Sequence, residues 1–372
     1  MTTDLALIAE RRGGLAAVLG LLVLEEPGPG IAGLVAGVPA LASLATSDPA
    51  IATEYERVFL RGVPLYESVF RSDDGQHGGE TLGIVVESYE RYGFTEYLEP
   101  RWRVAGVDHL GLQLRCLAHL CHQEATAWRA GTPDKAMEAV EAERSFLAQH
   151  LAAWAPVAVD GALRSMGEGA YTAVFEAIAD HLTEEFDRLR PAPLLSSDIE
   201  IETLPDNMGP ARLSRLLLAP ATSGTWLSST IIGRASRAIG APWRPSDTRA
   251  SLRHVLDDAE NTGDLDVVLE PIAAALDDAI TAHRRHTEES PGNAMHSEFW
   301  RRTAEQTLER LTHIANSGLY HRDHAMHSET FTISAPDSER LADVIDTMIG
   351  TLRRQGLCVQ RHVKSECASV SQ

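Results

Sequence analysis

The most constraining feature of the sequence is a run of apolar residues at helical spacing after Asp108. The run consists of Leu110, Leu114, Leu117, Cys121, Ala125 and Trp128. Positions three and four apart lie on one face of an α-helix, so this spacing predicts a long helix with one buried side. Asp108 is expected to be its N-cap, with the carboxylate accepting a backbone N–H of the first turn.

Composition favours the same class of structure. Ala, Leu, Glu and Arg dominate, runs rich in Val, Ile and Thr are nearly absent, and aromatic residues make up only 6%. Ala and straight-chain side chains favour helices. The hydrophobic fraction of 44% is enough for packed cores. We therefore expect an all-α protein, a helical bundle with an additional helical C-terminal region.

A chain of 372 residues is long enough for two domains. The proline-containing stretch 191–210 is the best candidate linker. It divides a helical domain at 1–190 from a helical region at 211–356, and 357–372 is expected to be a loose tail. Periodicity predicts helices near residues 3–24, 31–46, 49–61, 108–128, 167–189, 211–218, 229–239, 247–260, 264–288, 296–317 and 337–355.

The charge balance is acidic, with 33 Lys and Arg against 53 Asp and Glu. Nucleic acid and anionic lipid need a basic footprint, so neither is expected as a main partner. No stretch is long enough to span a bilayer, and we expect no membrane insertion. The acidity suits a basic partner segment, or serves solubility alone.

The N-terminus carries two adjacent arginines, Arg11 and Arg12, before an apolar run, as an export signal does. The run is short, and acidic residues stand on both sides of the arginines. An amphipathic first helix of the mature fold is therefore the preferred interpretation. Its buried face is expected to hold Ile8, Leu15, Leu19 and Leu22.

Motifs for enzyme chemistry are scarce. The sequence has no GxxxxGK[ST] loop, no strand-anchored GxGxxG, no GxSxG and no HExxH. The glycine-rich stretch "DGQHGGE" has neither the lysine nor the preceding strand of a phosphate loop, and a flexible turn is expected. The cysteines show no CxxC or iron–sulfur spacing, so reduced thiols are the simplest interpretation, and we expect no cofactor.

Five C-terminal histidines are the only metal candidates. They are His283, His286, His321, His324 and His327. Two imidazoles three residues apart on a helix can reach one metal ion. Neighbouring arginines would repel a cation, and no cysteine or carboxylate pattern completes a site. We expect a solvated histidine-rich surface.

The adjacent pair Asp108 and His109 is not expected to act as a catalytic dyad. Neighbours on a helix point about 100° apart, so their side chains do not hydrogen-bond to each other. His109 is expected in the exposed first turn of the helix, where the positive end of the helix dipole favours the neutral imidazole. In that position we expect it to face a groove.

Four segments in order carry a resemblance to a known family. They are "YERVFLRGVPLYESVF", "YERYGF", "VDHLGLQLRCLAHL" and "FLAQHLAAW". Over residues 5–190 the chain resembles the TorD/DmsD/NarJ-type chaperones of molybdenum oxidoreductases. The resemblance implies an all-helical cytoplasmic protein that is not an enzyme. It also implies binding of the immature catalytic subunit of a DMSO-reductase-type molybdopterin oxidoreductase, often through its twin-arginine leader, until the cofactor is loaded.

Carried over residue by residue, the resemblance points to two client-binding loops. They contain Tyr55, Phe59, Pro64, Tyr66, Glu67, Ser68, Asp108, His109 and Leu110. Leu65, Val107 and Gln113 depart from the family pattern, which usually has two prolines and an acidic residue there. These departures bear on which client is bound.

The chemistry of these residues suits a twin-arginine leader. Tyr66 and Phe59 are expected to take its apolar part, and Glu67 and Asp108 to face the guanidinium groups. A partly desolvated arginine–carboxylate bond contributes about 1.5–3 kcal/mol, and micromolar binding needs about 8 kcal/mol. In the alternative interpretation, Pro64 only stops a helix and Tyr66 only fills the core.

Two rival functions remain open at this stage. One is a metal-dependent enzyme built on the C-terminal histidines, and the other is a helical scaffold or regulator whose acidic surface binds an unrelated basic partner. No function is assigned to residues 211–356, and the stretch 216–243 within them is expected either to extend the client-binding surface or to serve as an oligomerisation arm. A monomer and a domain-swapped dimer with its hinge at 190–210 are both possible.

Overall fold

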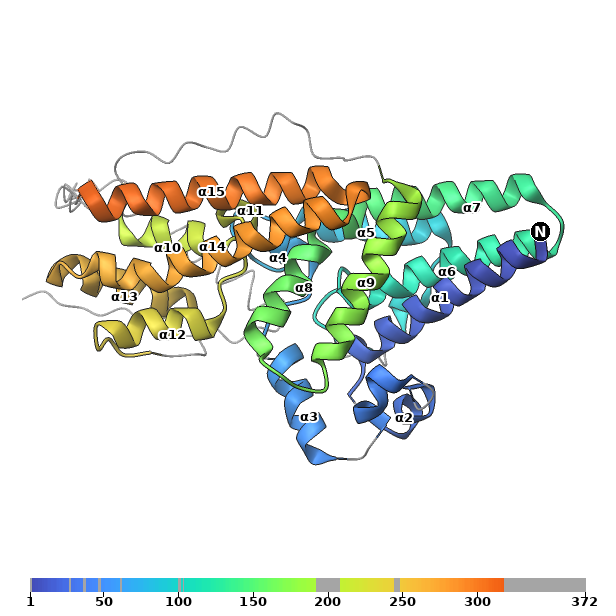
Figure 1. The fold of residues 1–372 in the computed structure, drawn as a ribbon, viewed down its shortest axis with the longest axis horizontal. Helices are drawn as coiled ribbons and strands as arrows, with labels where there is room; N and C mark the ends of the chain where they lie inside the picture. Colours follow the sequence, from blue (N-terminus) through green and yellow to red (C-terminus); the bar gives the residue numbers. More distant parts are fainter. Residues whose placement is uncertain are drawn as a thin grey trace, which may run out of the picture. The chain divides into compact units, whose positions relative to one another are not determined.

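A computed structural model describes residues 2–26, 28–35, 38–45, 48–60, 62–99, 102, 104–191, 208–243 and 248–317. Over these residues the chain forms α-helices joined by short turns and contains no strand (Figure 1). The expected all-α class is confirmed. Part of the predicted linker, the predicted helix at 337–355, the tail at 357–372 and His321, His324 and His327 lie outside the described residues.

The helices before the linker are α1 (Thr2–Leu24), α2 (Pro29–Val35), α3 (Pro49–Tyr55), α4 (Glu67–Arg71), α5 (Glu80–Tyr92), α6 (Leu110–Arg129), α7 (Pro133–Phe146), α8 (Ala152–Met166) and α9 (Thr172–Leu189). Those after it are α10 (Pro210–Leu218), α11 (Pro220–Ser223), α12 (Ser229–Ala238), α13 (Thr248–Thr262), α14 (Leu265–Glu289) and α15 (Ala294–Ser317). The predicted helices 211–218, 229–239, 247–260, 264–288 and 296–317 agree with α10, α12, α13, α14 and α15.

Helix α1 packs along α6, and the two run side by side in Figure 1. The close approach depends on glycine, because a Cβ at Gly20 would lie 2.7 Å from the carbonyl oxygen of Gly111. The predicted face of α1 is wrong in its first half, since Ile8 is 51% and Leu15 is 42% exposed. Small residues occupy that half of the interface instead, namely Ala6, Ala9, Gly13 and Ala16.

Proline interrupts one predicted N-terminal helix and starts the next, which agrees with its predicted range of 49–61. Instead of one helix over 31–46, α2 is followed by a 3-10 helix over Pro39–Ala45. Pro49 then stands at the start of α3, where the Asp48 carboxylate accepts the backbone N–H of Ala50 at 2.9 Å. This helix continues as a π-helix over Glu56–Leu60. Proline favours the first turn of a helix and breaks a helix interior, which explains both boundaries.

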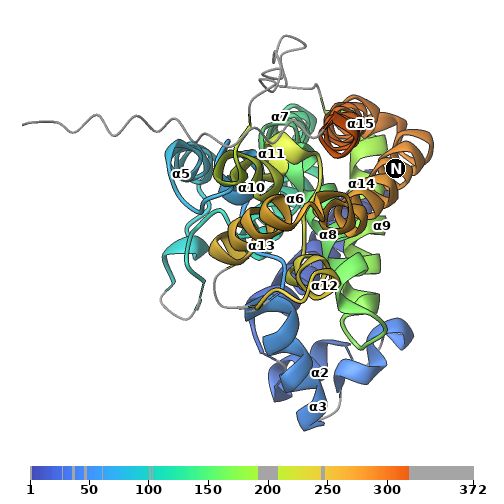
Figure 2. The ribbon, with the colours of Figure 1, turned by 90° about the vertical axis from the view of Figure 1, so that its left-hand side faces the viewer.

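The apolar stripe of α6 lies in the core, as predicted, with Leu110, Leu114, Leu117, Cys121 and Ala125 fully buried. It belongs to a first hydrophobic cluster formed by α1 to α9. A second cluster is formed by α10 and α12 to α15. Figure 2 shows the C-terminal helices end on, with α13 beside α10 and α15 beside α14, as their contacts require.

Trp300 of α15 joins the two parts of the fold. Its side chain belongs to the first cluster, and its indole N–H donates to the carbonyl oxygen of Ala153 at 2.9 Å. At the turn before α15, Gly292 lies directly against the backbone of Phe186 at the end of α9. None of the described helices combines the length and the apolar character that crossing a bilayer requires.

Candidate functional site

The two loops that the resemblance indicates lie against each other. Tyr66 and His109 form an isolated antiparallel bridge. The backbone N–H of Leu110 donates to the carbonyl oxygen of Leu65 at 2.8 Å. On the other side of the bridge, the hydroxyl of Tyr66 accepts the N–H of Ala105 at 2.9 Å. We call residues 63–68 and 105–110 the loop pair.

Asp108 caps a helix other than the one predicted. Its carboxylate oxygen Oδ2 accepts the backbone N–H of Ser68 at 2.9 Å, and its carbonyl oxygen accepts that of Glu67 at 3.1 Å. These N–H groups belong to the first turn of α4, so Asp108 supplies the cap from 40 residues away. The N-cap of its own helix, α6, is His109.

His109 is buried rather than exposed, with 5% of its surface accessible. Its Nδ1 accepts the backbone N–H of Gly111 at 3.2 Å, which requires an unprotonated nitrogen at that position. Burial lowers the pKa of His109 to about 3, so the ring is neutral at physiological pH. The expected neutrality therefore agrees with the structure, whereas the expected exposure is wrong.

The Glu67 carboxylate is the centre of a buried polar network. Its Oε1 accepts a hydrogen bond from Arg71, one turn later on α4. Its Oε2 accepts one from the amide of Gln113 and lies 2.9 Å from Nδ1 of His150. Burial disfavours the charge on Glu67, but His150 and Arg71 outweigh it and hold its pKa below the ordinary value. The negative charge of Glu67 is therefore already balanced by side chains of the protein itself.

His150 extends the network to α5. Its second nitrogen, Nε2, lies 2.9 Å from the hydroxyl oxygen of Ser88. Serine, histidine and glutamate are thus connected in the order of a hydrolytic triad. All three side chains are fully buried, so no substrate reaches the hydroxyl. The chain of hydrogen bonds fixes the position of Glu67 at the start of α4.

Gln113 explains one departure from the family pattern. Its amide nitrogen donates to Glu67, and its amide oxygen accepts the indole N–H of Trp154 at 3.2 Å. An acidic residue here would bring a second carboxylate against Glu67. The amide satisfies both neighbours without adding charge.

Tyr55 and Phe59 belong to an aromatic cluster of their own. Their ring centroids are 4.8 Å apart, and Phe59 packs against Tyr171 and Phe175 of the α9 region at 5.0 and 5.6 Å. Burial raises the pKa of Tyr55 to about 12, with smaller contributions from Glu26, Glu25 and Tyr66. Within the loop pair, Pro64 and Tyr66 are half-buried, while Ser68 and Leu110 are buried.

The two described histidines of the metal candidates are not a solvated pair. His283 is 1% exposed, and its Nε2 lies 3.0 Å from the carbonyl oxygen of Gly224. His286 reaches the Asp160 carboxylate at 2.9 Å. The two rings thus hold different contacts between α14 and the rest of the fold. Among the described residues no group of three His, Cys, Asp or Glu side chains has the arrangement of a metal site.

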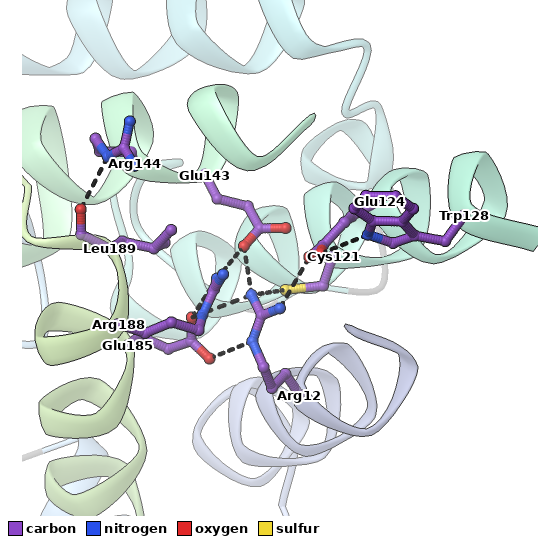
Figure 3. Close-up of polar contacts among 9 residues, drawn as sticks. All are labelled: Arg12, Cys121, Glu124, Trp128, Glu143, Arg144, Glu185, Arg188 and Leu189. Atoms are coloured by element: carbon purple, nitrogen blue, oxygen red, sulfur yellow. Dashed lines mark hydrogen bonds and ion pairs between the residues drawn. The ribbon is translucent and has the colours of Figure 1, made fainter. Parts of the chain in front are cut away.

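A second buried ionic cluster joins α1 to three other helices (Figure 3). The guanidinium of Arg12 donates to Glu185 at 2.7 Å, to Glu124 at 2.8 Å and to Glu143. Arg188 binds Glu143 and Glu185 as well. The second arginine of the signal-like pair is therefore an internal structural residue. It holds the half of α1 that buries only small side chains.

Several network residues have weak or no sequence signals. Arg71 stands four residues after Glu67, a spacing typical of a helical ion pair, and is the one that the sequence could have indicated. His150, Ser88 and Gln113 come from distant segments, and no local pattern connects them to Glu67. The histidine of "DGQHGGE", His77, also lies at the loop pair, with its Nε2 3.3 Å from Oδ1 of Asp108.

The fold and the site define an all-helical protein with two interlocked loops. Within these two loops no catalytic group is exposed. Residues 32–160 match the family model described as "Nitrate reductase delta subunit". The matched range is about a third of the chain and contains every candidate binding residue from Tyr55 to Leu110. The resemblance to the NarJ/TorD-type chaperone family is thereby confirmed over these residues.

The other comparisons add nothing to this match. No curated protein matches the chain significantly. No solved structure matches it either.

Proposed function

We propose that this protein is a cytoplasmic maturation chaperone, not an enzyme. It binds the immature catalytic subunit of a molybdopterin oxidoreductase of the DMSO-reductase type, through the twin-arginine leader, and assists cofactor loading. The observation that carries the proposal is the interlocked loop pair within the range that matches the nitrate reductase delta subunit family.

The geometry of the loop pair suits the binding of a short peptide. Pro64 and Tyr66 are partly exposed and offer an apolar ring and an aromatic face to a client. Behind them the backbone is held by the Leu110–Leu65 hydrogen bond and by the Asp108 cap. A preorganised surface loses little conformational entropy when a peptide binds, which favours affinity without a large interface.

The two carboxylates of the site have different roles in this proposal. Glu67 already contacts Arg71, Gln113 and His150, so it positions the loop and receives no client arginine. Asp108 uses Oδ2 for the cap, whereas its Oδ1 is buried and makes no hydrogen bond. An unsatisfied carboxylate oxygen is a strong acceptor for a guanidinium group. Asp108 is therefore the residue that we assign to the client's arginine.

The experiment is co-purification with mass spectrometry from cells that make a molybdopterin oxidoreductase. Wild type is compared with Tyr66→Ala and, as a matched control, with Tyr97→Ala, a half-buried tyrosine outside the loop pair. We expect the oxidoreductase subunit with wild type and with the control, and a loss of most of it with Tyr66→Ala. Absence of any such subunit from the wild-type sample contradicts the proposal.

A further inference from the structure

The glycine-rich loop 72–79 covers the loop pair. Ser68 of α4 accepts the backbone N–H of Gly78 through its hydroxyl at 3.0 Å. Gly75, Gly78 and Gly79 have φ angles of 63°, 112° and 74°, which residues with a side chain rarely adopt. Glycine is thus favoured at these three positions, and the hydrogen bond to the Ser68 side chain ties the end of the loop to α4.

His77 is the side chain that this loop places over Asp108. Its Nε2 lies 3.3 Å from Oδ1 of Asp108, and its ring stands edge-on to Tyr66 with centroids 4.6 Å apart. Gly106 makes room for it, since a Cβ there would lie 2.3 Å from the same Nε2. His77 itself is only partly buried, with 32% of its side chain accessible.

The surroundings of His77 are those that a guanidinium group prefers. A fully buried carboxylate oxygen without a hydrogen bond stands on one side, and an aromatic ring stands on the other. Arginine pairs strongly with carboxylates and stacks on aromatic faces. The His77 imidazole leaves Oδ1 of Asp108 without a hydrogen bond, because the contact between them does not have the geometry of one.

The C-terminal region holds the loop in place. Arg249 of α13 donates to the carbonyl oxygen of Asp74. Gly75 lies so close to the end of α10 that a Cβ would be 2.6 Å from the carbonyl oxygen of Leu218. Both contacts are made by residues beyond the predicted linker. The region that the family match does not cover therefore touches the candidate site through this loop.

We propose that residues 72–79 form a lid, that His77 occupies the place of a client arginine at Asp108, and that the C-terminal region holds the lid closed through Arg249. When a client binds, the lid opens at its glycines and the arginine replaces His77 between Asp108 and Tyr66. This inference rests on the proposed function for the identity of the arginine. It gives residues 210–317 a regulatory role.

The first test measures peptide binding by fluorescence anisotropy with the full-length chain. The probe is a synthetic peptide with two adjacent arginines followed by an apolar segment, and its control has two lysines. If the lid competes, His77→Ala and Arg249→Ala are expected to tighten binding of the arginine peptide about fivefold to tenfold, because a larger fraction of the protein is open. Asp108→Asn is expected to weaken it at least about tenfold.

Matched controls separate the lid from general effects of charge. Arg253→Ala removes an exposed arginine one turn later on α13, where it pairs with Asp257, and is expected to leave affinity unchanged. His122→Ala removes an exposed histidine on α6 and is also expected to leave the affinity for the peptide unchanged. Measurable peptide binding with the same affinity in wild type, His77→Ala and Arg249→Ala overturns the lid and leaves the chaperone proposal standing.

Hydrogen exchange tests the lid without any client. Arg249→Ala is expected to speed amide exchange over residues 66–79 and 105–110, while Arg253→Ala leaves it unchanged. If no form of the protein binds the peptide but exchange responds in this way, the proposed leader binding fails and the lid stands. Exchange in these segments that is identical in Arg249→Ala and wild type refutes the lid directly.

Discussion

At the scale of single residues, Glu67 and Glu143 show how this fold accommodates buried carboxylates. Glu67 is ionised because His150, Arg71 and Gln113 surround it. Glu143 has Arg12 and Arg188 on one oxygen, whereas its Oε1 is buried and makes no hydrogen bond. Burial raises the pKa of Glu143 to about 7, against the pull of the two arginines. The two sites therefore respond to pH in opposite directions.

The Glu143 pKa predicts a pH dependence of stability. The folded protein takes up this proton near pH 7, whereas the unfolded chain takes it up only near the ordinary value of 4.5. The contribution of Glu143 to the free energy of unfolding therefore increases as pH falls through 7, and above pH 7 it is absent. Between about pH 8 and pH 6, wild type is expected to gain about 1 kcal/mol relative to Glu143→Gln.

Urea unfolding of both forms at several pH values measures this difference. Glu141→Gln is the control, because Glu141 is exposed on the same helix and pairs with Arg144 at the surface. Its difference from wild type is expected to stay flat over the same range. A difference between wild type and Glu143→Gln that is also flat contradicts the raised pKa.

The amide of Gln113 gives a second prediction at this scale. Gln113→Glu places a carboxylate between the Glu67 carboxylate and the Trp154 indole, where one of the two acids must stay protonated. We expect a loss of about 3 kcal/mol in the free energy of unfolding at neutral pH, since holding a buried carboxyl protonated well above its ordinary pKa has a cost of this size. Gln123→Glu, exposed on the same helix, is expected to change it by less than about 0.5 kcal/mol. Equal stability of the two variants would show that the network does not require a neutral amide.

At the scale of secondary-structure elements, the close packing of α1 on α6 predicts how Gly→Ala substitutions change the free energy of unfolding. A Cβ at Gly20 would lie 2.7 Å from the carbonyl oxygen of Gly111, whereas one at Gly14 meets no atom within 4 Å. Gly20→Ala is therefore expected to lower the free energy of unfolding by about 1–3 kcal/mol. Gly14→Ala is expected to raise it by up to about 1 kcal/mol, through helix propensity alone. Thermal unfolding of the two variants compares them, and a stabilising Gly20→Ala would mean that the helices are less close.

Periodicity predicted the elements well where one face of a helix is buried by large side chains. This is the case for α6 and for α10 and α12 to α15, whose ranges agree within a few residues. It failed for the first half of α1, because alanine and glycine face α6 and the large apolar residues face outward. Hydrophobicity alone does not reveal that a close helix contact needs small residues.

The sequence predicted which two loops lie together but not how their side chains are bonded, and client binding by these residues stays a prediction. The sequence brought together Tyr66, Glu67, Ser68, Asp108 and His109, and the structure does the same. It assigned Asp108 to the wrong helix, because a cap supplied from 40 residues away leaves no local pattern. It left the loop at His77 without a role, since the contact of that loop with Asp108 and with α13 is entirely tertiary.

At the scale of the whole molecule, the contacts between the two hydrophobic clusters predict a single cooperative unit over the described residues. Trp300, His286 and Gly292 each contact a residue before the linker.

The Leu276 side chain is fully buried in the second cluster. Leu276→Ala is therefore expected to lower the free energy of unfolding by about 2–5 kcal/mol. Because unfolding is shared, the slowest-exchanging amides of α6 are expected to lose protection by the same free energy. Hydrogen exchange of α6 in Leu276→Ala and wild type measures this, with the exposed Val267→Ala as the control. Unchanged protection in α6 would mean that residues 1–190 unfold independently of the second cluster.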